Sequence, residues 1–240
     1  MTLTNKTVLI TGANRGIGRA LVQEALNRGA RRVYAATRKP LDHADPRVVP
    51  LMLDVTNDAQ IQEAAAAIDS LDILINNAGV AAYENLTDRE ALQAHLDVNL
   101  FGPHAMAQAF LPALTRSHGA IVNVLSVTAF AALPIIPAYS ISKAAAFSLT
   151  QSLRALHAGC VRVHAVMTGP TDTEMSRDFN VPKASPESVA QAIFDGVESG
   201  EDDIIPDPMS ASIAGSWRSG VLKAMERQNA AFVQGQSVAS

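Results

Sequence analysis

Cysteine, aromatic residues and long apolar runs are scarce in this chain, and their scarcity excludes several classes of protein. The single cysteine, Cys160, cannot form a disulfide within the chain or supply a thiolate metal cluster. It stands directly before an apolar segment, so we interpret it as a small buried side chain. No apolar run approaches the roughly 20 residues of a membrane-spanning helix. The first residues lack the pattern of a secretory signal, and we expect a cytoplasmic protein without a membrane partner.

Basic residues are also too few to suggest a nucleic-acid partner. The net charge is −4, and no block of like charge appears. His95, His104, His157 and His164 are scattered, with no carboxylate or second histidine at ligand spacing, so we expect them to be structural and predict no metal site. Hydrophobic residues make up 48% of the 240 residues, which is enough for a sizeable core.

Strand and helix signals alternate along the chain. This order is typical of an α/β fold, and we predict a single-domain, Rossmann-like, doubly wound parallel sheet of about seven strands with helices on both faces, over residues 1–240. Pro50 argues for a position near an edge or end of the sheet. The expected strands are Thr7–Thr11, Arg32–Thr37, Val48–Leu53, Ile73–Asn76, Gly119–Ser126, Val161–Val166 and Asp203–Pro206.

The helix starts are predicted from capping residues. Thr56 is positioned to cap the helix that contains IQEAAAAI, and Thr87 with Glu90 forms a capping-box pattern. The helix that follows Thr87 is expected to run past Asn99. The last 25 or so residues are irregularly patterned, apart from a short helix-like stretch near residues 221–232.

The first strand runs into a glycine-rich loop, Thr11-Gly12-Ala13-Asn14-Arg15-Gly16-Ile17-Gly18. Between a strand and a helix, this spacing predicts a dinucleotide site. Gly12 allows the tight turn, Gly16 lets a pyrophosphate approach the backbone, and Gly18 lets the helix pack closely on the sheet. A P-loop is excluded because it would end in Gly-Lys-Ser or Gly-Lys-Thr.

The end of the second strand indicates which dinucleotide fits. An acidic residue here usually holds the free 2′-hydroxyl of NAD, but this chain has Thr37-Arg38. Arg38 and Arg15 could pair with a 2′-phosphate, so we predict NADP(H) in preference to NAD(H). Asp42 or Asp45, if folded back, would favour NAD(H).

Tyr139 and Lys143 stand four residues apart, with Ser126 thirteen residues upstream. Positions i and i+4 share one face of a helix, so the phenol and the ammonium can converge. A nearby ammonium is expected to lower the pKa of a phenol, which favours proton exchange near neutrality. The three side chains are therefore candidates for moving a proton on and off a carbonyl oxygen.

Together these motifs resemble the short-chain dehydrogenase/reductase superfamily over roughly residues 5–205. The glycine loop, the Asn76-Asn77-Ala78-Gly79 segment, Asn99, Ser126 and the Tyr139-Lys143 pair occur in the family's order. The resemblance implies that Tyr139 is the general acid/base, that Lys143 tunes it and holds the nicotinamide ribose, and that Ser126 positions the carbonyl. It also implies that Asn99 holds a relay water at a helix irregularity.

The resemblance implies a cofactor site that extends beyond the glycine loop. Asp54 and Val55 look like the pair that contacts the adenine. The full set of expected cofactor-binding residues is Gly12, Asn14, Arg15, Gly16, Ile17, Gly18, Thr37, Arg38, Asp54, Val55, Asn77, Ala78, Gly79, Tyr139, Lys143, Gly169, Thr171 and Thr173.

The chain departs from the family pattern in two places. Relatives commonly have Pro-Gly-x-x-x-Thr after the sixth strand, whereas here proline has moved to position 170, behind Gly169. The C-terminus lacks the Gly-rich strand that many relatives use in tetramer contacts. We expect a homodimer or homotetramer, with a dimer through the helices of Asn99 and Tyr139 preferred.

The substrate is weakly encoded. The expected pocket residues are Tyr83, Val127, Leu133, Ile136, Met175 and Phe179, with a substrate loop at about residues 170–184. Mostly apolar positions favour an uncharged ketone or secondary alcohol as the small-molecule substrate. The predicted function is an NADP(H)-dependent carbonyl reductase or alcohol dehydrogenase. A non-catalytic NADP-sensing protein on the same fold is the alternative.

Overall fold

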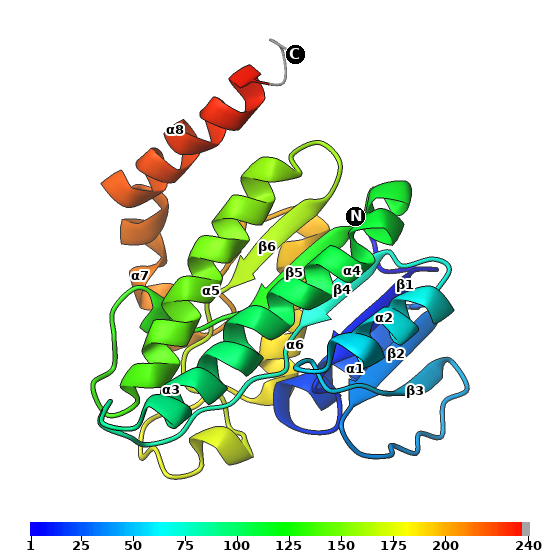
Figure 1. Ribbon diagram of the computed structural model, residues 1–240, viewed down its shortest axis with the longest axis horizontal. Helices are drawn as coiled ribbons and strands as arrows, with labels where there is room; N and C mark the ends of the chain where they lie inside the picture. The colour runs from blue at the N-terminus through cyan, green and yellow to red at the C-terminus, as the bar shows by residue number, and fades with distance from the viewer. Residues whose placement is uncertain (237–240) are drawn as a thin grey trace.

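The computed structural model describes residues 1–236 and contains a seven-stranded parallel sheet between two layers of helices (Figure 1). The strand order is β3-β2-β1-β4-β5-β6-β7, which confirms the predicted fold class. Pro50 lies on β3, the outermost strand, as predicted. The strands are β1 (Thr7–Thr11), β2 (Arg32–Thr37), β3 (Val48–Met52), β4 (Ile73–Asn76), β5 (Ala120–Val124), β6 (Arg162–Val166) and β7 (Asp203–Ile204).

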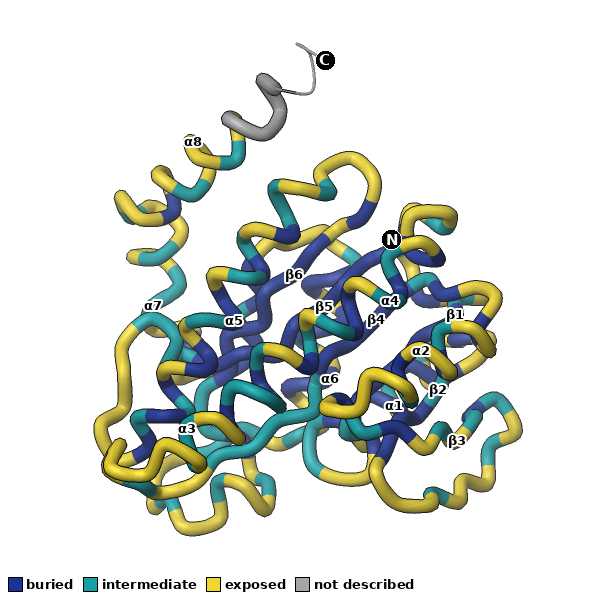
Figure 2. The backbone as a smooth tube through the Cα atoms, in the orientation of Figure 1, coloured by how far each residue is buried: buried dark blue, intermediate teal, exposed yellow. Residues whose placement is uncertain are grey.

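Helices cover both faces because the strands bury side chains on both. Val8 and Ile10 of β1 pack into one core with α1 (Gly16–Asn27) and α6 (Pro186–Ser199). Leu9 points to the opposite core, which is formed with α2 (Asp58–Ala67), α4 (Gly102–Ser117) and α5 (Pro137–Leu156). Figure 2 shows the buried strands between these layers. This two-sided burial is typical of parallel sheets.

The order of the strands reverses at β1: β2 and β3 lie on one side of it, and β4 to β7 lie on the other. This strand pairs with β2 on one side and β4 on the other, so that Ile10 lies opposite both Ala35 and Ile75. The loops that leave the carboxyl ends of β1 and β4 therefore turn to opposite faces. In open α/β sheets, ligands bind in the crevice at this point.

Two helices begin one residue later than their sequences predict. Asn57 caps α2 by accepting from the backbone N–H of Gln60, and Asp88 caps α3 (Arg89–Leu96). The predicted caps were wrong: each threonine side chain turns back to a side chain two residues upstream, where its hydroxyl donates a hydrogen bond. Thr56 donates to Asp54 Oδ1 at 2.8 Å, and Thr87 donates to Asn85 Oδ1 at 2.6 Å.

The C-terminal segment forms two helices, α7 (Pro208–Arg218) and α8 (Val221–Gln236), where the sequence predicted one short helix. α8 extends away from the sheet (Figure 1). A buried ionic cluster ties it down: Lys223, only 3% exposed, lies 2.6 Å from Asp203 of β7, and Arg154 of α5 lies 3.0 Å from the same carboxylate. Burial alone would raise the pKa of Asp203, but the two cations outweigh it and lower that pKa.

Other predictions have mixed outcomes. The predicted burial of Cys160 is wrong: its side chain is exposed in the turn before β6. No helix within residues 1–236 is long and apolar enough to cross a membrane. The single domain over residues 1–240 stays a prediction, and its last four residues lie outside the described part.

Candidate active site

A cavity of about 560 Å³ lies at the carboxyl ends of the strands. Its wall includes the glycine loop, the ends of β2 and β4, the segment after β5, the start of α5 and the loop after β6. Every predicted cofactor-binding residue lines this one cavity, and so do Ser126, Tyr139 and Lys143. The structure therefore brings together in space groups that are spread over 160 residues of sequence.

The glycine loop forms a backbone cradle at the start of α1. Gly12 has a φ of +66°, a conformation that other residues rarely adopt. A Cβ on Gly18 would lie 2.1 Å from the carbonyl oxygen of Gly12, so only glycine allows this packing. Arg15, the N-cap of α1, makes no side-chain capping hydrogen bond, and the first turn has no acidic residue. The free N–H groups at this helix end suit the pyrophosphate of a dinucleotide.

Asn77 ties the loop after β4 to the glycine loop. Its side-chain amide donates to the carbonyl oxygens of Thr11 and Gly12, at 2.9 and 3.3 Å. In return, the Thr11 hydroxyl accepts from the backbone N–H groups of Asn77 and Ala78, each at 3.0 Å. These reciprocal bonds close the floor of the crevice between β1 and β4.

Asn99 lies in the middle of a π-helical turn, η1 (Asp97–Phe101), between α3 and α4. The predicted helix irregularity is therefore present. Its buried amide accepts from Val80 N–H and donates to Val80 C=O, both at 2.9 Å, and donates to Ser142 Oγ at 2.9 Å. Asn99 is absent from the cavity wall. What the structure shows is a clamp between the loop after β4 and helix α5.

Hydrogen bonds to nearby residues hold the side chains of Ser126 and Lys143 in place. Ser126 caps the short helix η2 (Val127–Ala129), and its Oγ accepts from the N–H and hydroxyl of Thr128 at 3.2 and 3.0 Å. Because both contacts use its lone pairs, the hydroxyl proton of Ser126 remains for another acceptor. Lys143 Nζ donates to Val124 C=O at 2.8 Å and lies 5.6 Å from the centre of the Tyr139 ring.

Burial dominates the electrostatics of this site. It raises the pKa of the Tyr139 phenol to about 12, although hydrogen bonding with Ser126 acts in the opposite direction. It also lowers the pKa of the Lys143 ammonium to about 8. The sequence predicted a lowered tyrosine pKa, and the structure shows the reverse. The reason is that removal from water disfavours the charged form of each group.

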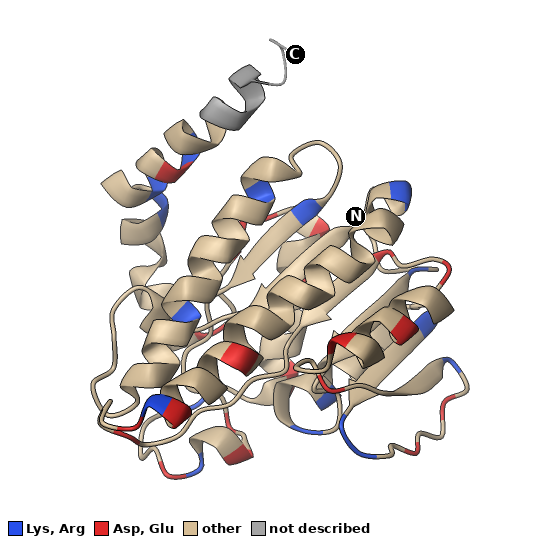
Figure 3. Cartoon of the chain, viewed as in Figure 1, with Lys and Arg blue, Asp and Glu red and all other residues tan. Residues whose placement is uncertain are grey.

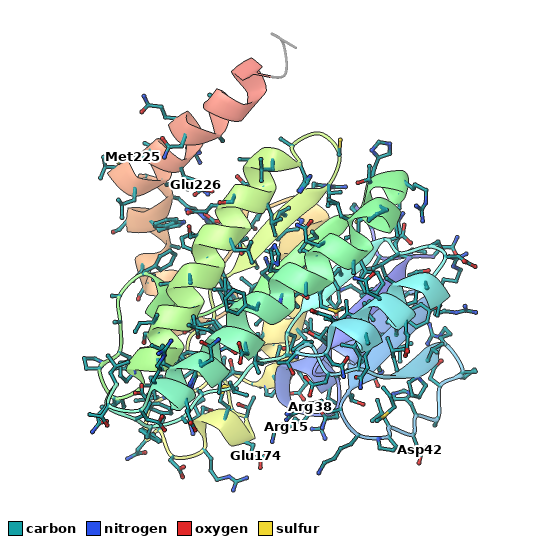
Figure 4. The ribbon with its side chains drawn as sticks, in the orientation of Figure 1. Arg15, Arg38, Asp42, Glu174, Met225 and Glu226 are labelled. Carbon is teal, nitrogen blue, oxygen red and sulfur yellow. The ribbon has the colours of Figure 1, made fainter. Side chains whose placement is uncertain are left out.

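At the end of β2, two arginines lie on the cavity wall. Arg15 and Arg38 both line it, whereas Asp42 lies farther along the loop after β2 (Figure 4). Asp45 does not fold back either, because its carboxylate pairs with Arg47 at 2.7 Å. Arg15 is ion-paired with Glu174. Neither Asp42 nor Asp45 lines the cavity.

The substrate side of the cavity is largely apolar. Five of the six predicted pocket residues line it, but Tyr83 does not: its ring stacks on Phe179, 5.6 Å between centroids. The cavity is also lined by Val98, Val181 and Met209, which were not among the predicted pocket residues. The start of α7 could have been found from Asp207-Pro-Met-Ser210, a capping pattern directly after a strand.

The low pKa of Lys143 gives a testable prediction. In the unfolded chain a lysine titrates near about 10.4, so between about pH 8 and 10.4 the folded protein binds fewer protons, and stability should rise with pH across that window. In ¹³C-lysine NMR, one resonance should titrate near pH 8 and vanish in Lys143→Arg. If every lysine resonance titrated at its ordinary value, the burial argument would be wrong.

Comparisons with known proteins agree with this geometry. The profile of the short chain dehydrogenase family matches residues 6–184. An uncharacterized oxidoreductase of Staphylococcus aureus is 32% identical over 211 residues, covering 80% of this chain and 90% of that protein. The bovine short-chain dehydrogenase/reductase 3 is 33% identical over 220 residues, covering 82% of this chain and 73% of its own length.

Solved structures extend the similarity to the C-terminal region. A short chain dehydrogenase from Burkholderia cenocepacia, in complex with NADP, is 40% identical with a TM-score of 0.87 and covers 95% of this chain and 98% of its own. The aldohexose dehydrogenase of Thermoplasma acidophilum is 27% identical with a TM-score of 0.73, covering 80% and 86%. This chain belongs to the short-chain dehydrogenase/reductase superfamily and is an oxidoreductase that acts on CH–OH and C=O groups.

Proposed function

We propose that this protein is an NADP(H)-dependent carbonyl reductase, or alcohol dehydrogenase, for apolar ketones and secondary alcohols. The observation that carries the proposal is the shared cavity: Ser126, Tyr139 and Lys143 lie on the same wall as a glycine cradle built for a dinucleotide. A sensor protein would need the cradle but would have no use for three converging proton-transfer groups.

The chemistry divides between the cofactor and the chain. When bound, a nicotinamide supplies or accepts the hydride. The hydroxyl proton of Ser126 is not used by Thr128, so it can turn from the Tyr139 oxygen to a bound carbonyl oxygen and stabilise developing negative charge there. In the direction of reduction, Tyr139 gives its proton to the forming alkoxide. Lys143, 5.6 Å from the phenol ring, favours the phenolate that remains.

Asn99 is proposed to act through position rather than contact. Its amide makes three hydrogen bonds, with Val80 and Ser142, so its support for proton relay comes from shaping the loop after β4. The roles of Ser126, Tyr139 and Lys143 and of the cofactor residues follow from the family resemblance together with their place on the cavity wall.

The proposed substrate is uncharged and largely apolar. Leu133, Ile135 and Met175 line the cavity, and each exposes more than a third of its surface there. Exposed apolar side chains at a cavity wall gain stability when an apolar ligand removes them from water. Glu174, the acidic residue among these positions, is already paired with Arg15, which leaves little charge to recognise an ionic substrate.

The first prediction tests the acid/base. Tyr139→Phe should reduce NADPH-dependent ketone turnover by about 10³-fold, because general acid catalysis typically contributes about 10²–10⁴-fold. NADPH affinity should be nearly unchanged, since the ring remains. Steady-state kinetics on a ketone panel and fluorescence titration of NADPH measure the two. Tyr34→Phe, the same change on β2 outside the cavity wall, is the control, and near-parental turnover by Tyr139→Phe would refute the assignment.

The second prediction tests the cofactor preference. Arg38→Ala should lower the ratio of kcat/KM for NADPH to that for NADH by about tenfold or more, because a hydrogen bond to a charged group contributes about 1.5–3 kcal/mol. Arg32→Ala provides a matched control at the opposite end of β2. An unchanged ratio in Arg38→Ala, or a parent that prefers NADH, would contradict the proposed NADP(H) preference.

We also propose that the protein is a homodimer through the outer faces of α4 and α5. These faces carry few charges (Figure 3), and Ile141 and Leu156 of α5 are exposed, as is Phe101 at the end of η1, directly before α4. Exposed apolar side chains on helix faces with few charges are typical of a self-association surface. The proposal is supported by the low charge of these helix faces and by the exposure of these apolar side chains.

The third prediction tests this dimer. Sedimentation velocity should give twice the 25.3 kDa chain mass for the parent, and Ile141→Glu should shift it towards the monomer, because a desolvated charge would be left unpaired at the interface. Val221→Glu, at an even more exposed apolar site on α8, should leave the mass unchanged. A monomeric parent at micromolar concentration would refute the proposal.

A further inference from the structure

The loop after β6 is held from the C-terminal segment by one carboxylate. Asp207 Oδ2 accepts from the backbone N–H of Gly169 at 2.7 Å. The same carboxylate caps α7: its Oδ1 accepts from Ser210 N–H at 3.0 Å, and Oδ2 accepts from the Ser210 hydroxyl at 2.7 Å. Asp207 is 6% exposed, so these three donors satisfy a carboxylate that is almost out of contact with water.

This contact depends on the residue type at both of its positions. A Cβ on Gly169 would lie 2.5 Å from Asp207 Oδ1 and 3.1 Å from Met209 Cβ, so a larger residue could not approach the carboxylate. A proline before this glycine would fix φ in the loop. This chain has Thr168 there instead, and the hydrogen bond from Gly169 supplies a restraint from a different part of the chain.

The restrained loop lies at the catalytic end of the cavity. Val127, directly after Ser126, donates its N–H to Thr168 C=O at 3.0 Å. The Thr168 hydroxyl donates to Leu125 C=O at 2.8 Å. Gly169, Pro170 and Thr171 then line the cavity beyond Ser126, whereas Arg38 lines it at the carboxyl end of β2. The loop therefore faces the reacting end of a dinucleotide and not its 2′-phosphate.

We propose that Asp207 is a positioning residue that holds the Gly169–Thr171 segment in the shape that binds the nicotinamide half of the cofactor. This inference rests on the proposed function. Asp207 itself is absent from the cavity wall, and it acts through the backbone of Gly169. Through the same carboxylate, the start of α7 and the cofactor loop are fixed as one unit.

Asp207→Ser separates the two tasks of this side chain. Serine is a good N-cap, so α7 keeps an acceptor for Ser210 N–H. Its hydroxyl ends one bond short of the carboxylate oxygens and cannot reach Gly169. Asp207→Asn is the second variant: an amide has one oxygen, so the backbone N–H groups of Gly169 and Ser210, which use different carboxylate oxygens in the parent, cannot both keep an acceptor. Asp88→Ser makes the same change at the cap of α3, outside the cavity wall.

The experiment compares an intact dinucleotide with a fragment by isothermal titration calorimetry. NADP⁺ carries the nicotinamide, and 2′-phospho-ADP-ribose lacks it. Asp207→Ser should bind NADP⁺ about tenfold more weakly than the parent and bind the fragment with unchanged affinity. Asp207→Asn should show the same selective loss, and Asp88→Ser should show none. Thermal unfolding of each variant establishes that it is folded at the temperature of the titration.

Two results would overturn the role of Asp207 alone. One is unchanged NADP⁺ affinity in both Asp207 variants. The other is an equal loss for NADP⁺ and for the fragment, which would indicate a general effect on folding rather than on the nicotinamide end. A parent that binds neither ligand would instead overturn the proposed cofactor, and the inference with it. The three outcomes are distinct because the parent and the variants are titrated side by side.

Discussion

The reciprocal hydrogen bonds between Thr11 and Asn77 are the constraint on which the rest of the site depends. They join the loops that leave β1 and β4, the two strands between which the sheet changes direction. Both loops must diverge to opposite faces, and without a tie the crevice would have no fixed floor. Gly18 packs against the same point, where a Cβ would lie 2.6 Å from Asn77 Nδ2. One asparagine therefore sets the position of the glycine loop, the start of α1 and the segment that Asn99 clamps.

A second constraint is the free energy that is needed to bury a charged group beside Tyr139 and Lys143. Burial moves the pKa of Tyr139 up to about 12 and that of Lys143 down to about 8. At neutral pH the phenol therefore keeps its proton while the lysine remains charged, which is the pair of states that reduction of a carbonyl requires. Oxidation of an alcohol would need the phenolate, the form that burial disfavours.

Much of this arrangement could be predicted from the sequence, because it depends on local patterns. Strand periodicity located all seven strands, and the glycine spacing and the Tyr139–Lys143 pair are short-range signals. The errors share a different cause, which is competition between contacts. Thr56 and Thr87 are good caps whose hydroxyls are used elsewhere, and Tyr83 faces Phe179 across 96 residues of sequence. The reversed pKa of Tyr139 follows from burial, a quantity that residue spacing alone does not contain.

The structure of the C-terminal segment was the hardest to predict from the sequence. This segment contacts the loop after β6 and the residues that follow Ser126. α8 turns its buried lysine towards the protein and exposes Val221, Leu222 and Met225, the reverse of an ordinary amphipathic helix, so its pattern gave a weak signal. α7 carries Trp217. The centroid of its ring lies 4.4 Å from the ring centroid of Phe130 and 5.5 Å from that of Phe147.

Phe130 follows η2, the turn that Ser126 caps. Trp217 therefore packs beside a turn whose residues Val127 and Thr128 line the cavity. The Trp217 indole also donates to Asp203 at 2.7 Å, within the ionic cluster that holds α8. The family profile ends at residue 184, yet contacts from residues beyond that point reach both Gly169 and the turn at Ser126. The C-terminal segment beyond the family profile is thus also the one that holds the loop after β6 and the turn at Ser126.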